Sequence, residues 1–138
     1  MSASSRLIGT WKVKRVEVTS QTPIALPKEA ISVFTEREDG IQYVSDLIYS
    51  DGKKRRTEST FRLDGQSYGI AGGTHGDTWS IRETGPNSFE AIVMCKGRIS
   101  AKASTTISSD HKLMTTDWEL IQAEGPTITY RTLAEREG

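Results

Sequence analysis

The sequence predicts an all-β fold, a single antiparallel up-and-down β-barrel of about eight to ten strands with little helix. Two patterns indicate this fold. Short segments in which apolar and polar residues alternate recur along the chain, and tight turns such as Asp51-Gly52 and Asp64-Gly65 separate them. No segment shows a sustained apolar period of about 3.6 residues, so parallel βαβ architecture is not expected.

The first predicted strand covers residues 7–18 and contains a shift in its apolar pattern. Trp11 and Val13 lie on one face of an extended strand, whereas Val16 and Val18 lie on the other. One extra residue between these pairs, a β-bulge after Lys14, would return both pairs to the same face and bend the strand. A bent first strand allows the sheet to curl round and close.

The elements that follow are short strands joined mostly by turns. Residues 19–27 contain two prolines and are expected to form a loop, and residues 27–30 are expected to make one helical turn that starts with Pro27. The strand at residues 98–107 alternates almost without exception between small or apolar side chains and charged or hydroxyl side chains. Further strands are expected at residues 30–35, 41–49, 53–63, 66–71, 78–83, 88–96, 112–121 and 127–134.

Composition indicates one domain that covers residues 1–138, with no internal linker and no membrane-spanning segment. Lysine plus arginine and aspartate plus glutamate number 18 each, so there is no field to attract nucleic acid or an anionic membrane. Cys95 is the only cysteine, which fits a cytoplasmic location, and we expect its thiol to be buried and inert. If a signal peptide has been removed, a periplasmic or secreted location is expected instead. The sequence is also compatible with a homodimer.

Gly9-x-Trp11, followed by an all-β meander of this length, resembles the calycin superfamily of lipocalins and fatty-acid-binding proteins. The string at residues 7–12 is similar to that of small bacterial lipocalin-like proteins. In lipocalins the matching tryptophan closes one end of the barrel and an arginine late in the chain covers it. The resemblance therefore implies barrel closure by Trp11 and Arg131, with Arg136 as the next candidate, and a guanidinium over an indole face is a favourable contact.

Two features place the chain nearer to lipocalins than to fatty-acid-binding proteins. Residues 19–30 are too short and too rich in proline for the helix-turn-helix lid of the latter, and Tyr130-Arg131 differs from their Arg-x-Tyr. The sequence also lacks the C-terminal helix of most lipocalins. Nitrobindin-like haem barrels resemble it in strand count, and they would require a histidine ligand.

Small side chains on one face of the strand at residues 98–107 predict a cavity inside the barrel, because barrels of this size either fill such space or enclose a ligand. Aromatic side chains would line a mostly apolar pocket; alternatively, they fill the space and make a solid core. Continued alternation turns Arg55 inward near the mouth, where it could pair with a ligand carboxylate. The ligand-binding residues expected on this basis are Tyr43, Arg55, Phe61, Tyr68, Trp79, Ala101, Ala103, Trp118 and Tyr130.

The two histidines lie in separate turns. His75 belongs to the glycine-rich connection at residues 72–77 and could ligate a metal or haem, or shuttle a proton at the rim. Glycines on both sides favour a flexible hairpin tip instead, and His111 is expected to be solvated. Two isolated histidines do not make a zinc site, so no metal is expected. No cofactor is expected either, although haem stays a minority hypothesis because it needs only one axial ligand.

These patterns predict a non-catalytic binding protein for a small, largely apolar ligand that enters opposite Trp11. The motifs of the commonest enzyme classes are absent from the sequence. An enzymatic function is still an alternative, because catalytic groups converge in space and need not be close in sequence. The alternatives are a barrel enzyme of the isomerase or cyclase type in the same cavity, a haem-binding barrel, and a structural or interaction module with a filled core.

Overall fold

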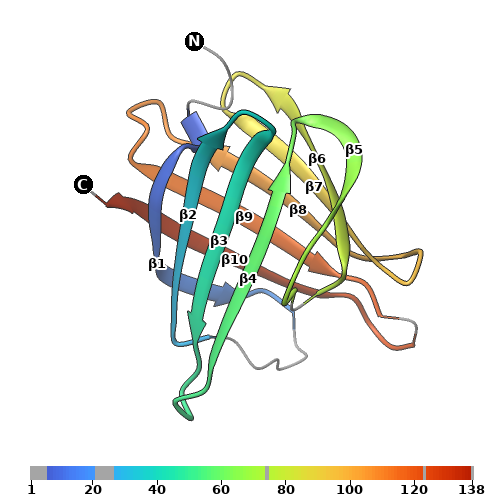
Figure 1. The fold of residues 1–138 in the computed structure, drawn as a ribbon. Helices are drawn as coiled ribbons and strands as arrows, with labels where there is room; N and C mark the ends of the chain where they lie inside the picture. The colour runs from blue at the N-terminus through green and yellow to red at the C-terminus, as the bar shows by residue number, and fades with distance from the viewer. Residues whose placement is uncertain (1–5, 21–26, 74, 123, 138) are drawn as a thin grey trace.

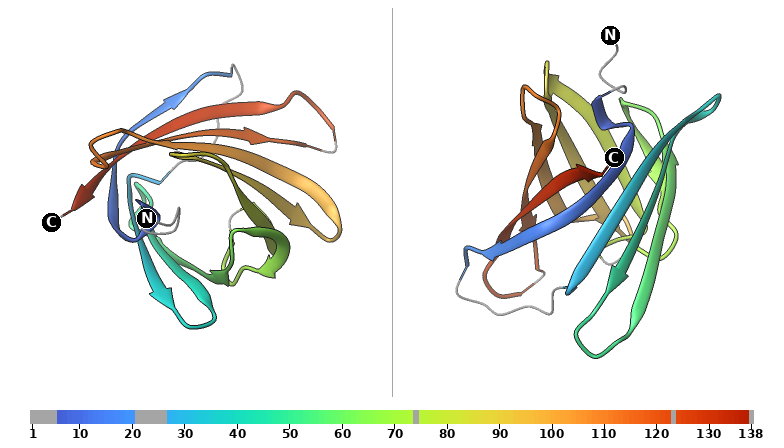
Figure 2. Two further views of the ribbon diagram at one scale, coloured as in Figure 1. Left: turned by 90° about the horizontal axis from the view of Figure 1, so that it is seen from above. Right: turned by 90° about the vertical axis from the view of Figure 1, so that its left-hand side faces the viewer.

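The computed structural model describes residues 6–20, 27–73, 75–122 and 124–137, which form one ten-stranded antiparallel sheet. The sheet curls into a nearly closed barrel, so the predicted all-β class is confirmed (Figures 1 and 2). Within these ranges no helix has the length and apolar character needed to cross a membrane. The strands are β1 (Gly9–Val18), β2 (Glu29–Arg37), β3 (Gly40–Ile48), β4 (Lys54–Phe61), β5 (Asp64–Gly69), β6 (Thr78–Gly85), β7 (Ser88–Cys95), β8 (Arg98–Ile107), β9 (Leu113–Leu120) and β10 (Ile128–Glu137).

The strand order confirms the up-and-down topology expected from the repeated hairpins. Neighbours in the sheet follow the order β4-β3-β2-β1-β10-β9-β8-β7-β6-β5. Pairing of β1 with β10 brings the first and last strands of the chain side by side, and the view from above shows the strands arranged around an interior (Figure 2).

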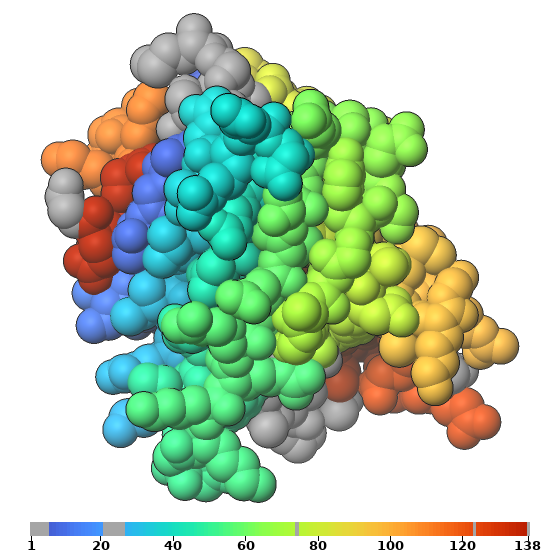
Figure 3. All heavy atoms as spheres, viewed as in Figure 1, coloured from blue at the N-terminus to red at the C-terminus, as the bar shows by residue number. Residues whose placement is uncertain are grey.

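The ladder is interrupted only between β4 and β5, among the strands described. A single backbone bridge joins Glu58 to Ala71 across this seam. On either side of the bridge, the hydroxyls of Thr57 and Ser59 donate to backbone carbonyls of the opposite segment at 3.0 and 2.7 Å. Atoms from both sides cover the seam in the space-filling view (Figure 3). Side chains therefore replace part of the missing backbone ladder.

The bulge predicted in the first strand is present. The register of β1 against β10 shifts between Val13 and Arg15, so Lys14 has no register partner, and β1 is strongly curved (Figure 1). The bulge returns Val16 to the inner face that Trp11 and Val13 share, as the apolar pattern requires. Val18, at the end of the strand, is exposed.

The helical turn expected at residues 27–30 is wrong. β2 already begins at Glu29, and the Lys28 amide donates to the Ile48 carbonyl at 2.6 Å. Pairing with β3 therefore outweighs the local helical preference of a proline-led turn. Residues 21–26 of the predicted loop lie outside the described residues.

Trp11 closes one end of the barrel, as the resemblance implied, but Arg136 covers it rather than Arg131. Trp11 is 1% exposed and its Nε1–H donates to the Leu7 carbonyl at 2.9 Å. The Arg136 Cζ atom lies 4.3 Å from the centroid of the indole ring. Arg136 also donates to the carbonyls of Ile8, Arg6 and His111, the last two at 2.6 and 2.8 Å.

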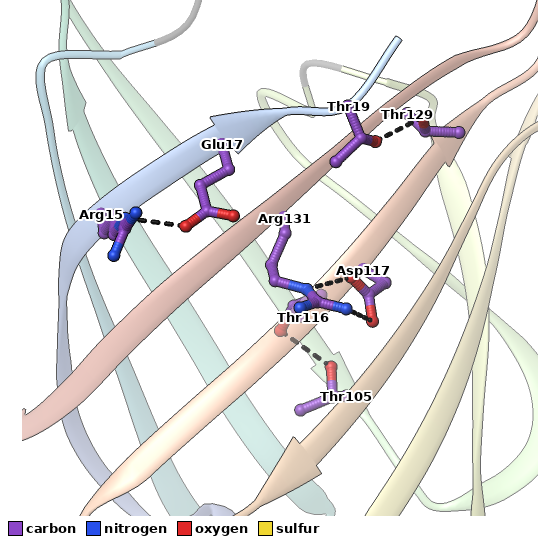
Figure 4. Close-up of polar contacts among 8 residues, drawn as sticks. All are labelled: Arg15, Glu17, Thr19, Thr105, Thr116, Asp117, Thr129 and Arg131. Atoms are coloured by element: carbon purple, nitrogen blue, oxygen red, sulfur yellow. Dashed lines mark hydrogen bonds and ion pairs between the residues drawn. The ribbon is translucent and has the colours of Figure 1, made fainter.

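Arg131 lies on the outer surface, where its Nε atom donates to an Asp117 carboxylate oxygen at 2.6 Å (Figure 4). The reason is strand alternation. Tyr130 faces the interior, so Arg131 must face outward and Arg136 must return to the inner face.

Gly9 explains the glycine of the Gly-x-Trp pattern. Its φ of +137° lies in a region that side chains with a Cβ rarely adopt. A Cβ at this position would also collide with the Arg136 guanidinium. The glycine therefore leaves room for the arginine that covers Trp11.

The expectation of a buried Cys95 is wrong, because its side chain is exposed. Cys95 pairs with Arg98 at the end of the β7–β8 hairpin, beyond a register shift that follows Val93. We therefore expect the thiol to react stoichiometrically with Ellman's reagent in native buffer, at a rate close to that of the denatured chain. A thiol that reacts only after denaturant is added would contradict this placement.

Candidate functional site

The barrel encloses a cavity of about 460 Å³, so the interior is hollow rather than filled. Its walls are mainly apolar, and they carry nine of the ten phenylalanine, tyrosine and tryptophan side chains of the protein. Trp11 lies at the closed end, whereas Lys28 and Arg55 lie near the opposite end, at the beginnings of β2 and β4. We call this opposite end the mouth.

Two of the nine predicted ligand-binding residues do not line this cavity. The Tyr68 hydroxyl donates to the Asp64 carboxylate at 2.7 Å, which holds the side chain along β5. Ala101 is fully buried, but its register partners Val93 and Leu120 reach the cavity and it does not. The other seven line the wall, and their role in binding stays a prediction: Tyr43, Arg55, Phe61, Trp79, Ala103, Trp118 and Tyr130.

His75 lies inside the barrel, so the interpretation of a flexible hairpin tip is wrong. Its Nε2 atom is 3.0 Å from the Tyr130 hydroxyl oxygen, and its ring centroid is 5.2 Å from that of Trp118. The Trp118 and Tyr130 rings are nearly parallel, at 10°, because they are register partners on β9 and β10. The Ser100 hydroxyl donates to the His75 carbonyl at 2.5 Å and ties the connection to β8.

Burial keeps this hydrogen-bonded pair neutral. Burial, and to a lesser extent the charge of Arg55, lower the pKa of His75 below its usual value of 6.5. Burial also raises the pKa of Tyr130, and the nearby Tyr43 and Tyr49 hydroxyls add to this effect. At neutral pH the pair therefore presents an uncharged imidazole and an uncharged phenol to the cavity. Depending on the imidazole tautomer, the Tyr130 hydroxyl offers the cavity either a lone pair or its proton.

The lowered pKa of His75 predicts a stability that falls in mild acid. The unfolded chain binds a proton at this residue near pH 6.5, whereas the folded chain binds it only at lower pH. Protons therefore favour the unfolded state as the pH falls below about 6.5. We expect wild type to lose more unfolding free energy than His75→Gln between pH 7.5 and 5.5, measured by urea denaturation. Equal losses in the two proteins would contradict a buried neutral imidazole.

The described lining residues at the mouth carry positive charge and include no acidic side chain. Arg55 donates from Nε and Nη2 to the carbonyls of Gly72 and Gly73 at 2.8 and 3.0 Å, across the seam between β4 and β5. Lys28 is the second cationic side chain at the mouth, and no aspartate or glutamate occurs among the cavity-lining residues that the structure describes. The field at the mouth therefore favours an electron-rich group on a ligand.

A second aromatic group forms the wall on β2, β3 and β6. The Tyr43 ring centroid lies 5.0 Å from that of Phe34 and 5.2 Å from that of Trp79. Burial raises the pKa of Tyr43 more than its hydrogen bonds with Ser45 and Ser32 lower it. The phenol is therefore neutral at neutral pH.

Several hydroxyls of this interior have hydrogen-bond partners within the protein. Trp79 Nε1–H donates to the Ser59 hydroxyl at 2.8 Å. The Thr105 and Thr116 hydroxyls lie 3.1 Å apart (Figure 4). Paired groups of this kind allow an apolar cavity to carry polar atoms without an unsatisfied hydrogen bond.

His75 is the histidine that would serve a haem iron, because it is the one histidine among the described residues that line the cavity. Its Nε2 atom already lies within hydrogen-bonding distance of Tyr130. An iron bound at this nitrogen would have to replace the contact with Tyr130, and haem binding stays a prediction. The described residues also contain no group of three or more histidine, cysteine, aspartate or glutamate side chains that could hold a metal ion.

Comparison with known proteins identifies the fold. No protein-family model and no curated protein matches the sequence. The structure is similar to that of Rv2717c from M. tuberculosis, with a TM-score of 0.66 at 16% identity over 99% of this chain and 96% of that one. It is also similar to zebrafish ileal bile acid-binding protein complexed with cholic acid, with a TM-score of 0.59 at 10% identity over 96% and 99% of the two chains. At these identities the likeness shows the fold alone, and that fold is the calycin barrel expected from Gly9-x-Trp11.

Proposed function

We propose that this calycin-fold chain is a non-catalytic binding protein that holds a small, largely apolar ligand inside its barrel. The cavity is the observation that carries the proposal. Its volume of about 460 Å³ falls within the range typical of small-molecule sites, about 300–1,000 Å³. Its mainly apolar wall with a few fixed polar groups is the usual composition of such sites.

The fold supports the same proposal. The zebrafish protein with which the chain shares this fold is a bile acid-binding protein complexed with cholic acid. That protein thus binds a small molecule, and we infer a comparable use for the cavity of this chain.

The two ends of the barrel suggest how a ligand would enter. Trp11 and Arg136 close one end with an aromatic ring, a guanidinium and several hydrogen bonds. The mouth, in contrast, carries Arg55 and His75. We infer entry at the mouth, with the apolar part of the ligand directed towards Trp11.

Two measurements test the binding function. Native mass spectrometry of freshly purified protein should reveal a co-purified small molecule. Titration with fluorescent fatty-acid and retinoid analogues should give saturable binding at one site per chain. The absence of any co-purified molecule, together with no uptake of either analogue, would count decisively against the proposal.

A second candidate function is an isomerase that uses the same cavity. The observation that favours it is the contact of neutral His75 with Tyr130 close to Arg55, since a neutral imidazole can accept a proton from carbon and a phenol can stabilise an enolate. Incubation with 2-tetralone in D₂O tests it. Faster deuterium exchange next to the carbonyl with wild type than with His75→Gln would support catalysis, and equal rates would count against it.

A further inference from the structure

We propose, on the basis of the binding function above, that the ligand is a flat, unsaturated ring compound with a hydroxyl group attached directly to the ring. The ring would lie between the two aromatic walls of the cavity. The hydroxyl would lie at the mouth, in hydrogen-bonding contact with the His75–Tyr130 pair.

The first argument is where the aromatic side chains gather. Only one of the ten phenylalanine, tyrosine and tryptophan residues, Tyr68, lies outside the cavity wall. A flexible saturated chain needs only apolar surface, which aliphatic residues supply equally well. Aromatic rings, in contrast, gain additional stabilisation from offset-stacked or edge-to-face contact with another ring. A wall that holds nine of the ten aromatic side chains therefore favours a ligand that is itself a ring.

The second argument is that the rings form two separate groups on opposite sides of the interior. One group contains Tyr43 on β3 and Trp79 on β6, with ring centroids 5.2 Å apart. The other contains Trp118 on β9 and Tyr130 on β10, with centroids 6.0 Å apart and nearly parallel planes. In the sheet, β1 and β2 separate β3 from β10, and β7 and β8 separate β6 from β9. Inward side chains on such strands face each other across the barrel, and the ligand ring would lie between them.

The third argument is the position of the polar groups. The Tyr130 hydroxyl and the His75 imidazole belong to rings of the wall itself, and they lie 3.0 Å apart at the mouth. A ligand ring beside Trp118 therefore brings an oxygen in its own plane close to both groups. The groups that face His75 are Tyr130, Trp118 and the cationic Arg55. No carboxylate that could compete for the hydroxyl proton of the ligand occurs among the described lining residues.

Isothermal titration calorimetry with matched probes tests this inference. The probes are 2-naphthol, 2-methoxynaphthalene, which keeps the ring system but has no hydroxyl proton, and decahydro-2-naphthol, which keeps the hydroxyl but is saturated. We expect 2-naphthol to bind at least tenfold more tightly than either of the others. Equal affinity for 2-naphthol and 2-methoxynaphthalene would overturn the hydroxyl contact, and equal affinity for 2-naphthol and decahydro-2-naphthol would overturn the placement of the ring between the aromatic walls.

Decanoate separates a failure of this inference from a failure of the proposed function. If decanoate binds and 2-naphthol does not, the cavity is a ligand site but the ring hypothesis is wrong. If neither binds and the fluorescent analogues are not taken up, both proposals fail.

A matched pair of variants locates the contact. Tyr130→Phe removes only a hydroxyl, and we expect it to weaken 2-naphthol binding at least tenfold while it leaves 2-methoxynaphthalene binding unchanged. A purely structural role of Tyr130 would weaken the binding of both probes and would overturn the assignment. Tyr68→Phe is the control, because the Tyr68 hydroxyl contacts Asp64 and its side chain is outside the cavity wall; it should change the affinity for neither probe.

Discussion

Arg136→Met should lower the free energy of unfolding by about 2–4 kcal/mol, because it removes a cation–π contact and leaves three partly buried carbonyls without this donor. The guanidinium lies 4.3 Å from the Trp11 ring and donates to three backbone carbonyls that converge at the closed end of the barrel. Methionine keeps a chain of similar length, so the loss reflects the charged head rather than the packing of the stem. Urea denaturation followed by tryptophan fluorescence measures the change.

Arg131→Met is the matched control. The Arg131–Asp117 ion pair lies on the outer surface, with side chains 48% and 53% exposed, so its removal should leave the free energy of unfolding nearly unchanged. The same substitution, five positions apart on one strand, is thus expected to have very different effects. Similar losses in the two variants would show that the arginine over Trp11 does not stabilise the closed end.

The contrast between these two arginines shows that strand alternation alone can predict which of them faces the interior. Once Tyr130 is placed inside, a period of two residues puts Arg131 outside and Arg136 inside. The alternation that predicted the strands therefore also indicates Arg136 as the arginine that covers Trp11. Arg136 was only the second candidate, and the expected strand at residues 127–134 ended before it, whereas β10 continues to Glu137.

The fold was predictable to a large extent because it depends on local patterns. The period of two residues located all ten strands within a few residues, and the apolar shift near Lys14 identified the bulge. Turn residues such as Asp51-Gly52 supplied the hairpins, and hairpins between consecutive strands specify most of an up-and-down barrel. The pairing of β1 with β10 joins residues far apart in the sequence, and no local pattern predicts it. Closure of the barrel was expected instead from the resemblance carried by Gly9-x-Trp11.

The candidate site was only partly predictable, because its polar part depends on a connection without periodicity. Alternation placed Tyr130 and Trp118 on the inner face. His75, however, follows β5 by several residues in a glycine-rich segment, and no local pattern indicates that its side chain enters the barrel. Its position follows from long-range contacts, among them the Ser100 hydroxyl bond to its carbonyl. The presence of Tyr130 at the same end was the one available hint, since a buried phenol needs a hydrogen-bond partner.

The exposure of Cys95 was also not predictable from a local pattern, because it depends on contacts with a neighbouring strand. Simple alternation along β7 places it on the face of Val93, but the register shift after Val93 and the adjacent hairpin end expose it. Irregularities of this kind depend on the partner strand and are not visible in one segment.

Ala103→Leu should abolish or greatly weaken ligand binding, because the branched side chain would extend into the cavity. Ala103 lines the wall between its register partners Ala91 and Trp118, and it is 4% exposed. We expect at least a tenfold loss of affinity for both 2-naphthol and the fluorescent fatty-acid analogue, which corresponds to about 1.4 kcal/mol or more. Overpacking of a core costs about 1–3 kcal/mol, but the new side chain enters empty space, so the barrel should remain folded in thermal melts.

Ser104→Leu makes the matching change one residue further along β8, where the side chain faces solvent. It introduces the same leucine on the outer surface, and it should leave the affinity for both probes unchanged. The pair therefore separates occupation of the cavity from a general effect of added apolar surface. If Ala103→Leu binds both probes as tightly as wild type while remaining folded, the ligand does not occupy this cavity. In that case the small side chains on the inner face of β8 would serve the packing of the barrel and would not provide space for a ligand.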